Sequence, residues 1–224
     1  MNSSEKLVEM LEHVMHSLKL IENKTHQTSA MEFMKSVEDI DFVKFSFDQW
    51  MKFLADIDTK NRDLRELFVH KFAWAMPNRR VLNAIAKYCQ DKTVLEVNAG
   101  NGLWSYLLKM LGVDIKVTDI NPWKKTYTEI ETMDGVNAVK TYLTDVLITV
   151  WPPYQCEQIG QTLKQFKGNT LIYLGENRQG CTGSQEFFDE LESSWELKEQ
   201  IKMQNWRGLF DAMYVYVRKE VKQN

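Results

Sequence analysis

The most constraining part of the chain lies near its middle, where two short apolar runs flank a turn and a helical repeat. The first run, Val94–Val97, suits a buried parallel strand because it is apolar and rich in β-branched residues. Gly100 and Gly102 permit a sharp turn and leave the backbone open to close approach. The second run, Ile115–Thr118, is followed directly by Asp119. This order predicts a strand, a glycine turn, a helix and a second strand, the βαβ unit of an α/β sheet.

Such a unit can hold a nucleoside. Bare backbone amides and a helix N-terminus face one end of the ligand, and a carboxylate about 20 residues further on can accept hydrogen bonds from ribose hydroxyls. Nicotinamide enzymes favour G-x-G-x-x-G, but Ser105 stands at the third glycine position here. Class I methyltransferases favour an acid followed by spaced glycines, which Glu96, Gly100 and Gly102 match, with Asn98 at the first glycine position. The stretch therefore resembles the S-adenosylmethionine (SAM) site of class I methyltransferases; the alternative is a βαβ unit with an ordinary turn.

This resemblance implies a set of cofactor-binding residues. In such a site the turn at 98–102 faces the methionine end, Asp119 takes the ribose hydroxyls, and Ile120 or Trp123 covers the adenine. The predicted cofactor is SAM, bound by Glu96, Asn98, Gly100, Gly102, Asp119 and Ile120.

The end of the chain distinguishes further between the two cofactor families. Residues 196–203 and 212–218 follow one another directly, and the second run alternates with a period of two, which indicates a hairpin of strands. A class I methyltransferase sheet ends this way, with an antiparallel seventh strand beside the fifth. Residues 137–142, 146–150 and 170–174 are predicted as the third, fourth and fifth strands. The predicted fold is α/β, a Rossmann-like seven-stranded class I methyltransferase sheet with an N-terminal helical extension.

The first part of the chain is expected to be helical because residues 1–76 contain neither glycine nor proline. We predict a helical cap over 1–71 and a methyltransferase-like domain over 72–224. A stripe at helical spacing runs through Leu7, Leu11, Val14, Leu18 and Ile21. It predicts a core-facing amphipathic helix. The same spacing fits a coiled-coil seam, so a homodimer through the N-terminal helices is the alternative. Ser29 and Ser46 are predicted to begin two further helices, and Ser184 is predicted to begin a later helix over 185–194.

Aromatic and acidic residues follow the predicted fourth and fifth strands. Trp151-Pro-Pro-Tyr154 resembles the D/N-P-P-Y/F motif of amino-methyltransferases at its last three positions. Trp151 has no carbonyl to accept a hydrogen bond from a target amine, so we expect stacking on a planar or cationic acceptor. The alternative is a proline turn with buried aromatic side chains. Glu176 is the candidate acid, base or amine-binding carboxylate. Its alternative is a structural partner for Arg178 or backbone amides. The predicted catalytic residues are Tyr154, Glu176 and Trp151.

Residues 72–218 resemble a sparsely described group of small methyltransferase-like proteins. The likeness rests on 72–78, on Trp151–Tyr154, and on Gly175-Glu176 followed by Gly180-Cys-Thr-Gly183. It implies the fold and cofactor, not the acceptor. We therefore predict an enzyme, a SAM-dependent methyltransferase. The alternatives are a catalytically inactive binding module, suggested by Asn98, and a nicotinamide-dependent oxidoreductase.

Composition limits the partners. The net charge of −3 and the pI of about 5.9 provide no strong basic field, which favours a small-molecule or protein acceptor over nucleic acid. Three scattered cysteines form neither a disulfide framework nor a metal-ligand spacing, so no metal site is predicted. All four histidines precede residue 72, which disfavours Ser/His/Asp or Cys/His catalysis. Without a signal peptide or long apolar run, we expect a cytoplasmic protein and no membrane contact.

Overall fold

A computed structural model describes residues 30–220, except 34, 36 and 39. The predicted stripe from Leu7 to Ile21 and the predicted cap at Ser29 lie outside the described residues. The described residues divide into two compact units, one comprising those up to 78 together with 204–208 and the other comprising 79–203 and 209–220. The prediction had divided the chain at 71/72. Phe72 explains the difference, because its ring packs 4.7 Å from that of Phe68 and belongs to the helical unit.

The helical unit is built around aromatic side chains. Its regular elements are η2 (Phe42–Lys44), α3 (Phe47–Ala55) and α4 (Arg62–Lys71). Ser46 begins α3 as predicted, through a capping box in which its side chain and that of Gln49 each accept the other's backbone amide. Fully buried aromatic rings pack face to edge against one another in this unit, among them Trp50, Phe53 and Phe72.

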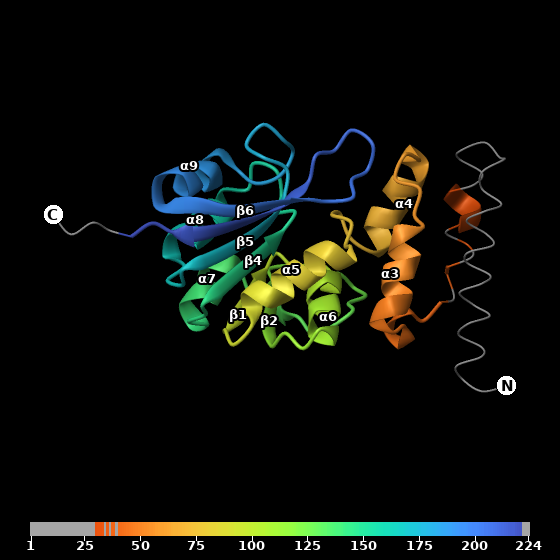
Figure 1. The fold of residues 1–224 in the computed structure, drawn as a ribbon, viewed down its shortest axis with the longest axis horizontal. Helices are drawn as coiled ribbons and strands as arrows, with labels where there is room; N and C mark the ends of the chain where they lie inside the picture. Colours follow the sequence, from red (N-terminus) through yellow and green to blue (C-terminus); the bar gives the residue numbers. More distant parts are fainter. Residues whose placement is uncertain (1–29, 34, 36, 39, 221–224) are drawn as a thin grey trace. The chain divides into compact units, whose positions relative to one another are not determined.

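The second unit holds a seven-stranded sheet (Figure 1). Its strands are β1 (Val94–Val97), β2 (Ile115–Asp119), β3 (Glu131–Thr132), β4 (Val146–Val150), β5 (Thr170–Gly175), β6 (Trp195–Lys202) and β7 (Ala212–Arg218). Its helices are α5 (Arg79–Cys89), α6 (Leu103–Met110), α7 (Gly135–Thr141), α8 (Glu157–Gln165) and α9 (Gln185–Ser194). Ser184 begins α9 as predicted, because its side chain accepts the amide of Phe187.

The strands lie in the order β3-β2-β1-β4-β5-β7-β6. The first five are parallel, and β7 is inserted antiparallel between β5 and β6. The predicted fold, a Rossmann-like seven-stranded sheet of the class I methyltransferase type, is therefore confirmed. The order reverses between β1 and β4, which is where ligands bind in open α/β sheets.

Both faces of the sheet are covered by helices, which is why β1, β4 and β5 are buried along their whole length. Alternate residues of β1 serve opposite faces. Leu95 and Val97 join a core that includes Ala138 of α7, Leu163 of α8 and Phe187 of α9. Glu96 points the other way, where its carboxylate accepts a hydrogen bond from Ser105 of α6.

The predicted third strand was wrong. Residues 137–142 lie largely within α7, which begins because the Asp134 side chain accepts the amide of Asn137. The third strand is the short β3, and the chain from 120 to 130 connects it to β2 without a helix. The loop at 142–144 therefore leads into the start of β4. There the Asp145 amide donates to Thr93, just before β1, so this loop lies at the amino edge.

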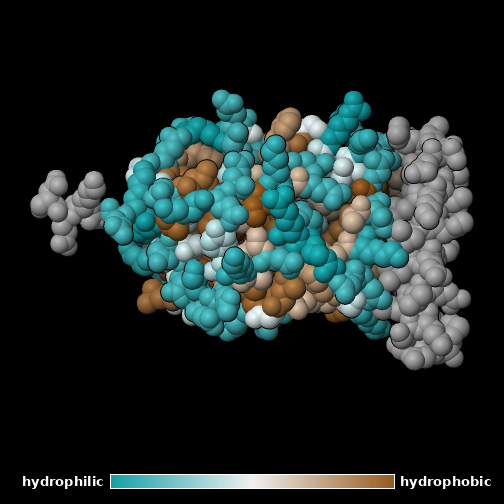
Figure 2. All heavy atoms as spheres, in the orientation of Figure 1, coloured by the Kyte–Doolittle hydropathy of each residue, from teal (hydrophilic) through white to brown (hydrophobic). Residues whose placement is uncertain are grey.

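Among the described residues, no helix is long and apolar enough to cross a membrane. The face seen in Figure 2 is mainly hydrophilic, with smaller hydrophobic areas between the polar side chains.

Candidate functional site

The glycine turn after β1 runs through three residues in left-handed conformations. Asn98 has a φ of 57°, Gly100 of 61° and Gly102 of 73°. Asparagine tolerates this region better than most residues, so Asn98 takes the kind of backbone conformation that glycine would supply. The turn leads into α6, whose first amide, that of Leu103, donates to the Asn101 side chain over 3.1 Å. Asn98 and Gly100 are partly exposed at this edge.

Asp119 ends β2 beside this turn. One carboxylate oxygen accepts the Gly100 amide over 2.8 Å, and the other accepts the Asn121 amide over 2.7 Å. The carboxylate is partly exposed, and each of its oxygens retains a further lone pair for a donor from solvent or ligand. Ile120, next along the chain, is 56% exposed. An acid and an apolar side chain therefore stand together at the edge beside the glycine turn.

The connection from β2 to β3 folds back against the glycine turn. The Trp123 amide donates to the Gly100 carbonyl over 3.1 Å, and the Tyr127 amide donates to the Asn101 carbonyl over 2.8 Å. A Cβ on Gly102 would lie only 2.9 Å from the Thr128 methyl group. The left-handed φ of Gly102 disfavours other residues, and the close contact with Thr128 disfavours any Cβ. Residues 123–130 support the turn and take the place of a crossover helix.

Glu96 lies beneath the turn rather than at its surface. It is 1% exposed, and Ser105, which donates to it, is fully buried. Burial raises the pKa of Glu96 to about 7, an effect that the Ser105 hydrogen bond partly opposes and the nearby Asp119 carboxylate reinforces. In this position Glu96 can fix the start of α6 against β1.

The loop after β4 contains the predicted stacking residues. Trp151 takes a φ of 50°, unusual for a bulky residue, and its amide donates to the Leu174 carbonyl over 2.8 Å. Its indole N–H donates to the buried carboxylate of Asp211 over 2.8 Å. Tyr154 is 61% exposed. Trp151 is thus held in place from β5 and from the start of β7, while Tyr154 is open to solvent.

The loops after β4 and β5 are joined through their backbones. The Gly183 amide donates to the Pro152 carbonyl over 3.0 Å, and the Gln155 amide donates to the Gly183 carbonyl over 2.8 Å. The segments 151–155 and 175–183 are well separated in the sequence, and both carry the likeness to one protein group. These hydrogen bonds join them into one structure at the carboxyl ends of the strands.

Glu176 is buried and fixes the loop after β5. Its carboxylate accepts the Cys181 amide and, through the other oxygen, the Phe210 amide, each over 2.8 Å. A Cβ on Gly180 would overlap the side chain of Glu176. The backbone-amide partnership considered from the sequence is thus present, whereas Arg178 pairs with Asp189 and Glu192.

The predicted site residues fall into two groups at the carboxyl edge. Asn98, Gly100, Gly102, Asp119 and Ile120 lie at the ends of β1 and β2, with Glu96 buried behind them, and Trp151, Tyr154 and Glu176 lie after β4 and β5. Sequence reasoning missed Asp211, which positions the Trp151 indole; it follows no motif and precedes β7 directly. Burial raises the pKa of the Cys181 thiol to about 11, with Glu176 adding to the effect, so the thiol is protonated at neutral pH. Within residues 30–220 as described, no group of His, Cys, Asp and Glu could hold a metal ion.

Comparison with known proteins gives only distant likeness. No family model matches the chain, and no curated protein matches it. Among solved structures, the N-methyltransferase NodS from Bradyrhizobium japonicum WM9 is 14% identical, with 63% of this chain and 94% of that chain covered and a TM-score of 0.48. Magnesium protoporphyrin IX methyltransferase (ChlM) from Synechocystis PCC 6803, with bound SAM, is 11% identical, with 88% and 98% covered and a TM-score of 0.47. The chain spans about half (49%) of a Streptococcus mutans protein at 15% identity, with 63% of this chain covered and a TM-score of 0.46. These values leave the activity of the chain to be inferred from its own residues.

Proposed function

We propose that this chain is a SAM-dependent methyltransferase that binds its cofactor at the carboxyl ends of β1 and β2 and transfers the methyl group to an acceptor beside Tyr154. The observation that carries the proposal is the position of the Asp119 carboxylate, 2.8 Å from the Gly100 amide at the carboxyl ends of β2 and β1. A ribose with two adjacent hydroxyls suits such an acid. The sheet order, with β7 antiparallel beside β5, departs from the order of a nicotinamide domain.

The residues at the turn fit the nucleoside end of SAM. Asp119 is partly exposed and offers acceptor capacity for ribose hydroxyls, and Ile120 offers apolar surface for the adenine. Asn98 has the left-handed φ that the turn requires, so its side chain does not prevent the turn from forming. Trp123 lies against Gly100, where a Cβ would come within 3.4 Å of its indole nitrogen, and supports the turn on that side.

Bound SAM supplies an electrophilic methyl group on its sulfonium. The chain's own contribution would be to hold the acceptor in line with that group, since proximity and orientation can provide most of the rate. Tyr154 is exposed and can stack on a planar acceptor. Trp151, fixed by Asp211, would form the wall behind it. We assign Glu176 to holding the loop, because both of its oxygens already accept backbone amides.

A second candidate function is nucleoside binding without methyl transfer. It is favoured by the lack of an acceptor for a target amine, since Trp151 offers only an N–H that is already bonded and Glu176 is buried in its loop. The same Asp119 and glycine turn would then serve a ligand that is bound and not consumed.

Calorimetric titration with SAM, S-adenosylhomocysteine and NAD tests the cofactor. We expect SAM binding in the wild type, and at least about tenfold weaker binding in Asp119→Asn, which keeps the shape and loses the charge-assisted hydrogen bonds. Asp114→Asn is the matched control, because Asp114 is an exposed acid before the other end of β2. No SAM binding at millimolar concentration, or preferred NAD binding, contradicts the proposal.

Turnover separates the two candidate functions. With SAM and a fractionated cell extract as the source of acceptors, a methyltransferase forms S-adenosylhomocysteine in a fraction-dependent manner, and Tyr154→Ala lowers this rate without changing SAM affinity. SAM binding with no product in any fraction supports the binding module. Loss of SAM affinity in Tyr154→Ala would mean that Tyr154 belongs to the cofactor site or the fold.

A further inference from the structure

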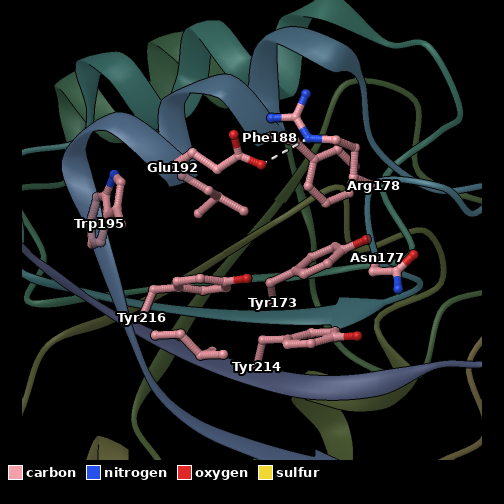
Figure 3. A pocket seen from close by; sticks show the side chains of 10 residues that line it. Tyr173, Asn177, Arg178, Phe188, Glu192, Trp195, Tyr214 and Tyr216 are labelled. Carbon is pink, nitrogen blue, oxygen red and sulfur yellow. Dashed lines mark hydrogen bonds and ion pairs between the residues drawn. The ribbon is translucent and has the colours of Figure 1, made fainter.

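A cavity of about 320 Å³ lies under α9 and reaches the loop after β5 at Asn177 and Arg178 (Figure 3). Its size falls in the range of small-molecule sites. Aromatic side chains dominate its lining, namely Tyr173, Phe188, Trp195, Tyr214 and Tyr216. The one carboxylate and the one guanidinium in the lining belong to Glu192 and Arg178.

The tyrosines line up because of the strand register. Tyr173 of β5 pairs with Tyr214 of β7, and Tyr216 follows two residues later on the same face. Their rings are stacked, with centroids 5.6 Å apart between Tyr173 and Tyr214 and 6.3 Å apart between Tyr214 and Tyr216. In Figure 3 the rings of Tyr173 and Tyr216 lie on one side of the cavity, and Glu192 extends from α9 on the opposite side. A ligand in the cavity would therefore meet aromatic surface below and a carboxylate above.

Charged side chains of both signs surround the cavity. Arg178 pairs with both Asp189 and Glu192, over 2.8 and 3.0 Å. The Arg218 guanidinium stacks 4.3 Å from the centroid of the Trp195 ring. The negative charge of Glu190 favours the protonated form of Arg218. The remaining acid of α9, Glu186, pairs with Lys164, and the Lys219 ammonium group donates to the Glu192 carbonyl, so the four carboxylates of α9 have four cations close by. In the cavity lining itself, Glu192 is the acid that an added cation would approach.

The aromatic rings suit a cation for a second reason. Burial raises the pKa of Tyr216 to about 12, and the pKa of Tyr214 is also raised, so these rings stay neutral phenols. The face of such a ring attracts cations. Two cations already use rings of this cavity, since Arg178 lies 5.7 Å from the Phe188 ring and Arg218 lies over Trp195. The side chain of Glu192 is 72% exposed, so the cavity meets solvent on the carboxylate side.

We propose that this cavity binds an organic ammonium group whose nitrogen carries methyl groups, as in a trimethylammonium. Such a group is both charged and apolar, and it needs no hydrogen-bond partner. It would lie between the ring of the partly exposed Tyr216 and the Glu192 carboxylate, with the buried ring of Tyr173 beside Tyr216. A primary ammonium would leave N–H donors unsatisfied against the rings, and a neutral ligand would gain nothing from Glu192. The inference stands whether or not the chain transfers methyl groups.

A pair of ligands with the same shape tests the charge requirement. Choline and its neutral isostere 3,3-dimethylbutan-1-ol are titrated into the full chain and followed by ligand-observed NMR and calorimetry. We expect choline to bind at least about fivefold more tightly than the alcohol, the range expected for a cation over aromatic rings. An acetylated, amidated trimethyllysine forms the second arm. Tighter binding of this peptide mimic points to a protein side chain as the natural source, and tighter binding of choline points to a free small molecule.

Variants test the position of the ligand. Tyr216→Leu should lower choline affinity about fivefold or more, whereas Tyr216→Phe, which keeps the ring, should stay within about twofold. Glu192→Gln should weaken choline binding and leave the alcohol unaffected. Glu190→Gln is the matched control, because it removes a carboxylate of the same helix that does not line the cavity. Circular dichroism and the melting temperature verify that each variant is folded.

Three outcomes overturn the proposal: no choline binding by the wild type at tens of millimolar, equal affinity for choline and the alcohol, or equal losses in Glu190→Gln and Glu192→Gln. Preferential binding of a neutral planar molecule such as indole also overturns it, because the cavity would then recognise ring stacking and not charge.

Discussion

Replacing Glu96 with glutamine tests the consequence of burying a carboxyl group inside the sheet unit. Glu96 is 1% exposed and accepts a hydrogen bond from Ser105. Glutamine has the same shape, can accept the same hydrogen bond and carries no charge at any pH. The comparison of the two side chains therefore isolates the cost of the buried charge.

The magnitude follows from the pKa. The ordinary glutamic acid pKa of 4.5 is raised to about 7 in the folded chain, mainly by desolvation. Below 4.5 both folded and unfolded chains hold this proton. Between 4.5 and about 7 the folded chain holds more protons than the unfolded one, so stability falls as the pH rises. Above 7 the loss is complete and amounts to roughly 3 kcal/mol at about 1.4 kcal/mol for each pH unit between the two pKa values.

The assay is urea unfolding of wild type and Glu96→Gln at pH 5, 6, 7 and 8, followed by hydrogen exchange of the sheet amides. Those amides report the unit that contains Glu96 and are distinct from the helical unit. We expect the advantage of Glu96→Gln over wild type to grow by a few kcal/mol from pH 5 to pH 8. Glu129→Gln, which changes an exposed carboxyl group, serves as the control and should show no such growth.

A difference between Glu96→Gln and wild type that stays constant from pH 5 to pH 8 would refute the reasoning. It would mean that Glu96 keeps one protonation state over this range. A growing difference in Glu129→Gln as well would point to general charge effects and not to burial.

Two further predictions concern special backbone positions. Gly180→Ala should lower the unfolding free energy by about 1–3 kcal/mol, because the new Cβ would overlap Glu176. Gly112→Ala is a comparison in which the new Cβ has open space, so a loss there reports the strain of its φ of 84° and not crowding. An unchanged unfolding free energy in Gly180→Ala, measured by urea unfolding, contradicts the packing explanation. Asn98→Ala should cost about 1 kcal/mol, because alanine tolerates the φ of 57° less well than asparagine, whereas Asn98→Gly should cost less. Equal urea midpoints for these two variants would show that the conformation of the turn does not limit stability.

Local signals in the sequence were sufficient for most elements of the sheet unit. Ser184 marked the start of α9, and the apolar run of β4 marked a buried strand. The error at 137–142 arose because a short segment containing valine, threonine and tyrosine has strand-like composition. The N-cap at Asp134, with Gly135 next, was the missed signal for a helix. The missing crossover helix after β2 has no local signal, because the segment is held by bonds to a turn more than 20 residues earlier, such as that from Tyr127 to Asn101.

The candidate site could be predicted in outline only. The positions of the glycine turn and Asp119 could be predicted, because each directly follows a predicted strand and so lies at the carboxyl edge of the sheet. The hydrogen bonding of the buried Glu176 carboxylate could not be predicted, because one of its two amide partners, Phe210, lies 34 residues away in the sequence. The cavity under α9 likewise depends on the pairing of β5 with β7, which brings Tyr173 and Tyr214 together from distant parts of the chain. Contacts of this kind are set by tertiary structure and leave no local trace.

Hydrogen bonds among Pro152, Gln155 and Gly183 join the loop after β4 to the loop after β5. The Phe210 amide donates to Glu176 and adds the segment before β7. These three segments are called the rim of the sheet. A ligand that moves Tyr154 must carry the loop after β5 with it or break these bonds. Opening of this rim should therefore be a cooperative event of the kind detected by hydrogen exchange, slower than the rotation of single side chains. For protein engineering, an insertion in the loop after β4 or in the loop after β5 would displace the other loop as well, because the two are hydrogen-bonded. The two loops therefore have to be redesigned together.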